Sequence, residues 1–123
     1  MNELNRKLAK WMGYEWRRDG YYKQRFEGVW DCKSLAEFNF TDPEFGIAHC
    51  FKWLVPVLKI NGFTLLSIEF MWDGDWVSCR IVFYATDETT QPRAYEERVF
   101  LGVPYNGNLA EALCLATEEL IDA

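Results

Sequence analysis

The sequence of 123 residues has a single histidine, His49, and lacks the common catalytic fingerprints. It has no G-x-S-x-G, P-loop, H-E-x-x-H or glycine-rich dinucleotide pattern. His49 and Cys50 are neighbours in a predicted helix, where adjacent side chains point about 100° apart and do not converge as a nucleophilic pair. Asp73 and Asp75 flank a predicted turn, where aspartate is favoured for backbone reasons. We therefore expect no enzymatic activity, no cofactor, and no catalytic or metal-ligating residues.

The sequence also lacks a long apolar run and does not open with a charged and then apolar signal segment. We therefore expect the protein in the cytoplasm of the host cell, without membrane contact. Four cysteines are present, and no C-x-x-C pair or Cys/His cluster occurs among them. This spacing predicts reduced, mostly buried thiols and no zinc site. The cysteines are Cys32, Cys50, Cys79 and Cys114.

No internal repeat, low-complexity tract or linker is present, so we expect a single domain over residues 1–123. Half of the residues are hydrophobic and 17% are aromatic, which is typical of a globular chain with a core. The net charge is −6, but residues 1–40 carry +2 whereas residues 41–123 carry −8. An acidic main body opposes adhesion to nucleic acid and favours basic partners, although such charge also serves solubility.

The strongest local signal is residues 63–85, which predict two long strands around Asp73-Gly74. Asp-Gly between alternating apolar runs is typical of a type I′ turn, which would pair Phe70 with Val77. The expected core face carries Leu66, Ile68, Phe70, Trp72, Val77, Cys79, Ile81 and Phe83. The opposite face carries Phe63, Leu65, Met71, Trp76, Val82 and Tyr84. Because that second face is also apolar, we expect either a second helix layer or a partner to cover it.

Apolar spacings of three and four predict helices at residues 2–12, between 41 and 61, and from 108 to 120. The last helix opens with a cap signature at Asn108, and its small residues Ala112 and Ala116 would allow close approach to the sheet. The middle helix has a capping-box pattern at Thr41 and Glu44, and Pro56 should kink or end it. Its expected buried stripe is Ile47, Phe51, Leu54 and Leu58. We predict a short hairpin around Asp19-Gly20, a loop over 26–40, and a third, edge strand over 94–103. The fold class is therefore α+β.

Three framework motifs resemble a known family. The pattern L-N-x-x-x-A-x-x-M-G-Y/W-x-W occurs as Leu4, Asn5, Ala9, Met12, Gly13, Tyr14 and Trp16, and a helix start occurs as Phe40, Thr41, Asp42 and Ala48. The closing A-E-A-L-C-L-A occupies residues 110–116. Together they resemble the phage ABA sandwich domain family of small phage and prophage proteins. The resemblance implies a three-layer α/β/α sandwich, with a small antiparallel sheet of three or four strands between helices. It supplies no catalytic residues, and the chain departs from it at Pro56 and at 17–25.

Two sets of charged residues are candidate binding surfaces. An acidic set on the third strand and last helix could face a nucleic-acid-binding protein, or be only a solvated face: Asp87, Glu88, Glu96, Glu97, Glu111, Glu118, Glu119 and Asp122. A basic aromatic set could stack on a base or nucleotide, or simply pack on the first helix: Trp16, Arg17, Arg18, Tyr21, Tyr22, Lys23 and Arg25.

The resemblance and the charge pattern together suggest a non-enzymatic phage or prophage protein. We expect it to inhibit a host defence system, as anti-CRISPR proteins do, by covering a basic nucleic-acid-binding surface of a host protein with its acidic face. That partner would be a defence nuclease, and direct binding to nucleic acid is not favoured. The alternatives are a sponge for a nucleotide signal, held by the basic aromatic set, and a virion or assembly component. The edge strand could also pair across a two-fold axis in a homodimer.

Overall fold

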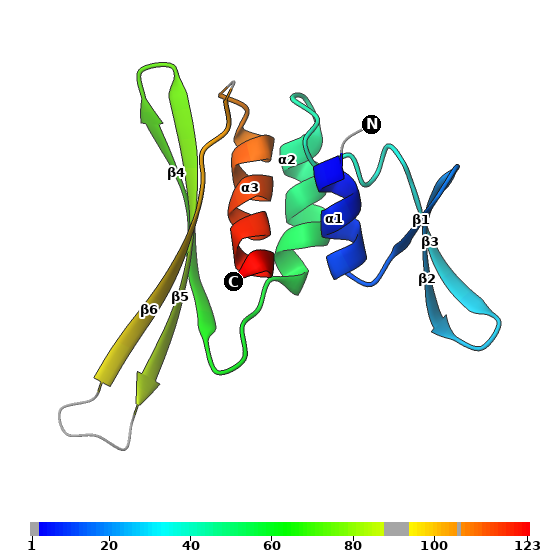
Figure 1. Cartoon of the computed structure of the whole chain (residues 1–123), viewed down its shortest axis with the longest axis horizontal. Helices are drawn as coiled ribbons and strands as arrows, with labels where there is room; N and C mark the ends of the chain where they lie inside the picture. Colours follow the sequence, from blue (N-terminus) through cyan, green and yellow to red (C-terminus); the bar gives the residue numbers. More distant parts are fainter. Residues whose placement is uncertain (1–2, 88–93, 106) are drawn as a thin grey trace.

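The computed structural model describes residues 3–87, 94–105 and 107–123. In that part of the chain a layer of helices lies between two antiparallel sheets of three strands each (Figure 1). The elements are α1 (Glu3–Trp11), β1 (Glu15–Arg17), β2 (Gly20–Phe26), β3 (Val29–Ser34), α2 (Gly46–His49), η1 (Cys50–Leu54), η2 (Val55–Val57), β4 (Thr64–Asp73), β5 (Trp76–Asp87), β6 (Ala94–Gly102) and α3 (Leu109–Asp122). The α+β class predicted from the sequence is confirmed.

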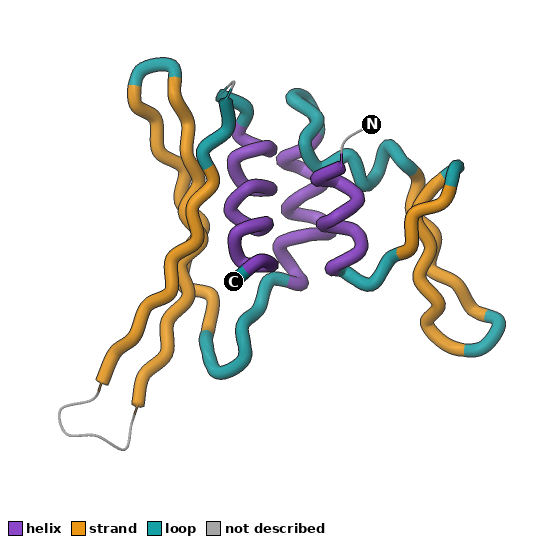
Figure 2. Tube along the Cα trace, in the orientation of Figure 1, coloured by secondary structure: helices purple, strands orange, loops and turns teal. Residues whose placement is uncertain are grey.

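The layer order implied by the family resemblance is not confirmed. Figure 2 shows the helices on one side of the β4–β5–β6 sheet, with the small β1–β2–β3 sheet beyond them. The other face of the β4–β5–β6 sheet carries no helix in the described part of the chain. Helices therefore separate two sheets here, whereas the expected sandwich has one sheet between helices.

The β4–β5 hairpin forms where the alternation predicts it, but its register differs by two residues. Asp73 pairs with Trp76 and Phe70 with Cys79, so the turn is Gly74-Asp75 and not Asp73-Gly74. Gly74 has a φ of +61°, and no described non-glycine residue has a positive φ. Glycine at the first central position is typical of a type II′ turn, in which only that residue needs a positive φ. Asp73 and Asp75 therefore keep a negative φ. A shift of two residues keeps each side chain on its predicted face.

A β-bulge at Leu66 changes the far end of β4. Leu65 pairs with Phe83 and Ser67 with Val82, which leaves Leu66 as the extra residue. The strict alternation had placed Leu66 in the core, but the bulge leaves its side chain 52% exposed. Phe63 and Leu65, expected on the opposite face, pack against the core instead.

The closing helix α3 packs tightly on the inner face of β6. Asn108 caps it as predicted, because the Asn108 Oδ1 accepts hydrogen bonds from the backbone N–H groups of Ala110 and Glu111 at 2.9 and 3.3 Å. A Cβ atom on Gly102 would lie 2.0 Å from the Ala112 carbonyl oxygen, so only glycine fits there. The expected close approach of this helix to the sheet is confirmed.

The middle helix begins later and winds differently from the prediction. Thr41 does not cap it: its first residue is Gly46, preceded by a turn in which the Asp42 side chain accepts from the Glu44 N–H at 3.2 Å. The π-helical segment η1 then shifts the buried side, so Phe51 is exposed. Leu54 and Leu58 are buried as predicted, and Gly46 and Cys50 are buried with them. Pro56 lies in the short 3₁₀ segment η2, which ends the helix as predicted.

The small sheet contains one strand that the sequence did not reveal. The predicted hairpin exists as β1 and β2, but Arg17 pairs with Gly20, so its turn is Arg18-Asp19. Residues 29–34, expected to be part of a loop, form β3 and pair with β2. A Cβ atom on Gly20 would lie 2.7 Å from the Lys33 carbonyl oxygen, which explains why glycine stands where these strands approach.

A buried chain segment, residues 39–41, connects all the helices. Phe40 is fully buried, and its N–H donates to the Asn5 Oδ1 on α1 at 3.1 Å. Its carbonyl oxygen accepts from the thiols of Cys50 on η1 and Cys114 on α3 at 3.4 and 3.5 Å. A Cβ atom on Gly46 would lie 2.6 Å from the same oxygen. Side chains of three helical segments thus satisfy the N–H and the C=O of one buried residue.

The residues beside Phe40 are held in the same way. The Asn39 carbonyl oxygen lies 3.1 Å from the His49 Nδ1, and because a carbonyl only accepts, this nitrogen carries the hydrogen. The Asn5 side-chain amide donates to the Asn39 Oδ1 at 3.0 Å, and the Asn108 amide donates to the Thr41 carbonyl at 2.9 Å. The lone histidine therefore has a structural partner.

Replacing Asn5 tests the importance of this segment. In Asn5→Ala the buried Phe40 N–H loses its acceptor, so we expect the free energy of unfolding to fall by about 2 kcal/mol. Urea unfolding followed by circular dichroism measures the change. Lys10→Ala, on the exposed side of the same helix, should change it by no more than about 0.5 kcal/mol. Equal effects of the two substitutions would contradict the role assigned to Asn5.

Candidate functional site

The outer face of the β4–β5–β6 sheet is an apolar surface that no helix covers among the described residues. The strand register sets Glu69, Arg80 and Leu101 in one row across the sheet and pairs Met71 with Ser78 in the next, where Val103, just past the end of β6, lines the same hollow. Tyr95 is exposed at the far end of this side of β6, and from Val99 to the hairpin end the exposed apolar side chains are Met71, Trp76, Val99, Leu101 and Val103. We name these five residues the outer sheet face.

The exposure of these side chains is unusual for their type. Trp76 is 56% exposed and Val103 57% exposed, and neither belongs to the buried core cluster. A hollow of about 370 Å³ opens between Met71, Trp76 and Val103 at the hairpin end. Two larger hollows lie against Pro43, next to the residues that hold the 39–41 segment, and two of similar size lie beside Trp16 and between Trp11 and Val57. Contiguous exposed apolar groups of this kind mark interaction surfaces.

Carboxylates border the outer sheet face on both sides. Glu69 and Asp73 lie on β4, on the same side of the sheet as Trp76, and Glu119 of α3 lies at the opposite edge, beside Leu101. Arg80 is the only cation on this face among the described strand residues, and it pairs with Glu69 at 3.6 Å. The surface therefore combines an apolar centre with a net negative border.

Glu119 has a second effect on the edge of the sheet. Its Oε2 accepts a hydrogen bond from the Leu101 N–H at 3.3 Å. β6 is an edge strand, so this N–H would otherwise be open to pairing with a strand of another chain. The carboxylate therefore blocks strand addition at this position, where a homodimer through the strand edge was one expectation.

The structure disperses the predicted acidic set. Glu118 and Asp122 both pair with Lys7 of α1, at 3.2 and 2.8 Å, and raise the pKa of that lysine, chiefly through the Asp122 hydrogen bond. Glu96 and Glu97 point to opposite faces of β6. Glu97 lies on the outer side of the sheet, and Glu111 is in the first turn of α3. Glu88 and the side chain of Asp87 lie outside the described part of the chain. Of the members of this set whose side chains the structure describes, only Glu97 and Glu119 therefore lie at the outer sheet face or its edge.

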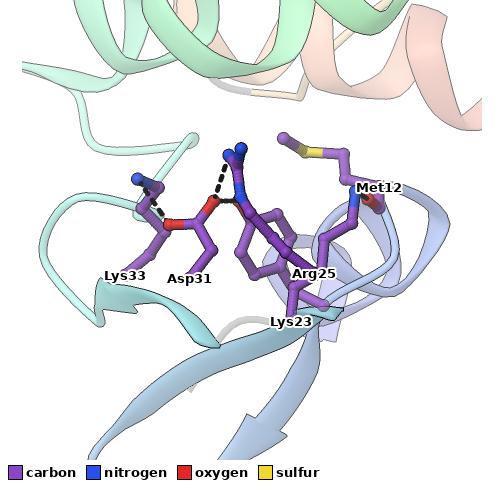
Figure 3. A network of polar contacts seen from close by, with 6 residues as sticks. Met12, Lys23, Arg25, Asp31 and Lys33 are labelled. Carbon is purple, nitrogen blue, oxygen red and sulfur yellow. Dashed lines mark hydrogen bonds and ion pairs between the residues drawn. The ribbon is translucent and has the colours of Figure 1, made fainter. Parts of the chain in front are cut away.

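The basic aromatic set is also divided between two faces. Tyr21 is buried in the core, and Lys23 donates to the Met12 carbonyl at 3.2 Å (Figure 3). Trp16 lies under the Arg6 guanidinium, 3.6 Å from the ring centroid. These side chains hold the small sheet to the helices, so the set does not form one nucleotide site.

Asp31 is the centre of the polar network in Figure 3. Its carboxylate accepts from the Tyr14 hydroxyl at 2.6 Å and pairs with Arg25 at 3.0 Å and Lys33 at 3.1 Å. The Tyr14 hydrogen bond, helped by the two cations, lowers the pKa of Asp31 to about 2. Burial and the same hydrogen bond raise the pKa of Tyr14. Arg25 and Lys33 are therefore occupied by a structural carboxylate.

On the opposite side of the small sheet, Arg17 lies over two rings. Its guanidinium is 4.9 Å from the Tyr22 ring centroid and 5.3 Å from that of Trp30, and it is 3.9 Å from the Glu15 carboxylate. Trp30 was not among the predicted site residues because residues 26–40 were expected to form a loop. A Glu27-Gly28 hairpin turn alone would pair Trp30 with Arg25, and it is the bulge between Gln24 and Phe26 that sets Trp30 opposite Gln24, on the same side as Tyr22.

The thiols are free, and three of the four are buried. Cys50 and Cys114 have their sulfur atoms 3.7 Å apart, and hydrogen bonding to Cys50 together with burial raises the pKa of Cys114. Burial also raises the pKa of Cys79, to about 12. In the described residues no three His, Cys, Asp or Glu side chains gather where they could bind a metal ion. None of the helices described here is long and apolar enough to span a membrane.

Comparison of the chain with protein-family models, with curated proteins and with solved structures gave no match in any of the three. The resemblance to phage ABA sandwich proteins is therefore supported only by the sequence motifs that suggested it.

The Asp31 network predicts a pH dependence of stability. A carboxyl group whose pKa falls from an ordinary 3.8 to about 2 on folding stabilises the fold above the ordinary value, and this contribution is lost as the pH falls toward 2. At pH 7 we expect Asp31→Asn to lower the free energy of unfolding by about 1–2 kcal/mol, and the difference from wild type to shrink between pH 4 and 2. Urea titrations across this range measure both quantities. A pH-independent difference, or an equal loss in Glu27→Gln at the exposed hairpin tip, would show that Asp31 is not the cause.

Proposed function

We propose that this protein is a non-enzymatic binding domain that acts by docking the outer sheet face on another protein. The observation that carries the proposal is the apolar face itself: Trp76, Val103 and their neighbours are exposed although every described helix packs on the other side. Trp is enriched at the energetic centres of interfaces, where a ring enters a desolvated contact. Covering this face removes apolar area from water and supplies the affinity.

A narrower form of the proposal names the class of partner. The sequence motifs suggest a phage or prophage protein, and the acidic border of the face favours a basic partner. We therefore propose that the partner is a host protein with a basic nucleic-acid-binding surface, such as a defence nuclease, which the domain inhibits by occupying that surface. The face that does so is the outer sheet face with Glu97 and Glu119 at its margin, in place of the whole predicted acidic set.

Paired capture experiments test the binding role. The wild-type chain and a Trp76→Lys, Val103→Lys variant serve as baits in lysate of the host cell, and each protein retained only by the wild type is purified and mixed with it. We expect a stable complex by light scattering, at least tenfold weaker for the variant because two contact residues become charged. If the captured protein is a nuclease, its activity should fall in proportion to the complex formed.

The control places the same change on the other sheet. Phe26 is exposed at the tip of the β2–β3 hairpin, so Phe26→Lys should leave capture and affinity unchanged. Thermal unfolding of each variant checks that the fold is retained. A complex that tolerates the double variant but not Phe26→Lys would contradict the proposal, and so would self-association through the outer sheet face without any other partner.

A further inference from the structure

We infer that the segment received by the outer sheet face is a basic amphipathic helix of the partner protein. This inference rests on the proposed function and specifies the shape and charge of the occupant. It follows from three features of the face: the direction of its apolar stripe, the position of its carboxylates, and the block at its edge.

The apolar residues form a stripe along β6. Val99, Leu101 and Val103 alternate along the strand and project to the outer side, and Trp76 and Met71 widen the stripe at the hairpin end. From Tyr95, exposed on the same side at the far end of β6, to Val103, just past its other end, the chain spans about 26 Å, at about 3.3 Å per residue. A helix of about 18 residues, with a rise of 1.5 Å per residue, has the same length. A helix with one apolar stripe therefore covers the outer sheet face and extends along β6 as far as Tyr95.

Net negative charge lies on both flanks of this stripe. On one flank Arg80 of β5 lies beside Leu101 and pairs with Glu69 of β4 at 3.6 Å, and Asp73 of β4 adds a second carboxylate there. Glu119 borders the stripe at the free edge of β6. An amphipathic helix whose apolar stripe has lysine or arginine on both sides would place a cation against each flank. Such complementarity fixes the orientation of the helix and raises the association rate.

Two other occupants fit less well. An added strand would need the Leu101 N–H, which already donates to Glu119 at 3.3 Å. A second copy of this chain, stacked face to face, would bring Glu69, Asp73 and Glu119 of both copies into one interface. Arg80 is the only strand cation available there among the described residues, and it already pairs with Glu69 at 3.6 Å. Such a dimer would be opposed by like charges.

The hollow between Met71, Trp76 and Val103 gives the stripe an anchor point. Its volume of about 370 Å³ is enough for one large apolar side chain of the helix. Trp76 forms one wall and Val103 another, and these two residues are the most exposed of the face. The contact that orients the helix along β6 is therefore expected at the hairpin end.

Three synthetic 18-residue peptides test the inference. The first has a leucine stripe flanked by lysines, the second has the same stripe flanked by glutamates, and the third keeps the lysines but has serines in place of the leucines. Titration calorimetry gives each affinity for the full-length protein, and amide shifts in nuclear magnetic resonance spectra locate the contact. We expect the lysine–leucine peptide to bind at least tenfold more tightly than either of the others, with shifts at Leu101, Val103 and the Trp76 indole.

Matched charge variants separate local pairing from the overall acidity of the protein. Glu69→Gln with Glu119→Gln keeps the side-chain acceptors but removes two charges, and should weaken binding of the lysine–leucine peptide about three- to tenfold at low salt. Glu27→Gln with Glu44→Gln removes the same charge from exposed positions elsewhere and should weaken it much less.

Equal binding of the glutamate–leucine peptide, equal binding of the serine peptide, or equal effects of the two charge pairs would overturn the inference. The proposed function would survive such a result if the captured partner still required Trp76 and Val103. Conversely, the peptides could bind as expected while the captured partner binds the Trp76→Lys, Val103→Lys variant as tightly as the wild type. That result would refute the proposed function and leave the inferred chemistry of the face intact.

Discussion

The whole arrangement depends on satisfying the backbone of the 39–41 segment, in which Phe40 is fully buried. Because this segment belongs to no helix or sheet, its N–H and C=O groups have no ladder partners. Asn39 has backbone turn partners in Ala36 and Asp42, but the N–H and C=O of Phe40 and the C=O of Thr41 are bonded by side chains. Those side chains come from α1, η1, α3 and Asn108, which caps α3. The same few peptide atoms therefore fix the helices relative to one another. Gly46 is required for the same reason, since any side chain there would displace the Phe40 carbonyl.

The position of α3 then determines which face of the main sheet is free. α3 lies so close to β6 at Gly102 that Ala112 and Ala116 contact the strand directly. The other helices gather on the far side of α3, around the 39–41 segment, and the small sheet is held there through Asp31 and the Arg6–Trp16 contact. One face of the β4–β5–β6 sheet is buried by this packing, and the opposite face keeps Trp76 and Val103 in contact with solvent.

Alternation along β4, β5 and β6 predicted most side-chain orientations, because faces depend only on parity and survive a register shift of two residues. The Asn108 cap and the end of the helix at Pro56 are local chemistry and were also predictable. The bulge at Leu66, the π-helical turn at Cys50 and the strand β3 were not, because tertiary contacts decide them. For the candidate site, Met71 and Trp76 were assigned to the second face from sequence, but the hollow that they share with Val103 requires the pairing of three strands.

Charge is the property that sequence reasoning located least well. A count of acidic residues on the third strand and last helix places Glu118, Glu119 and Asp122 in one group. In the structure Glu118 and Asp122 pair with Lys7, and Glu119 reaches the edge of the sheet. Glu69 and Asp73 were not selected by any pattern, but the register places them beside the apolar stripe. A net charge of −6 therefore says little about recognition until the carboxylates with internal partners are set apart. Glu69, Asp73 and Glu119 border the apolar face, and in the proposed complex they would select and orient a partner whose affinity comes from the covered apolar area.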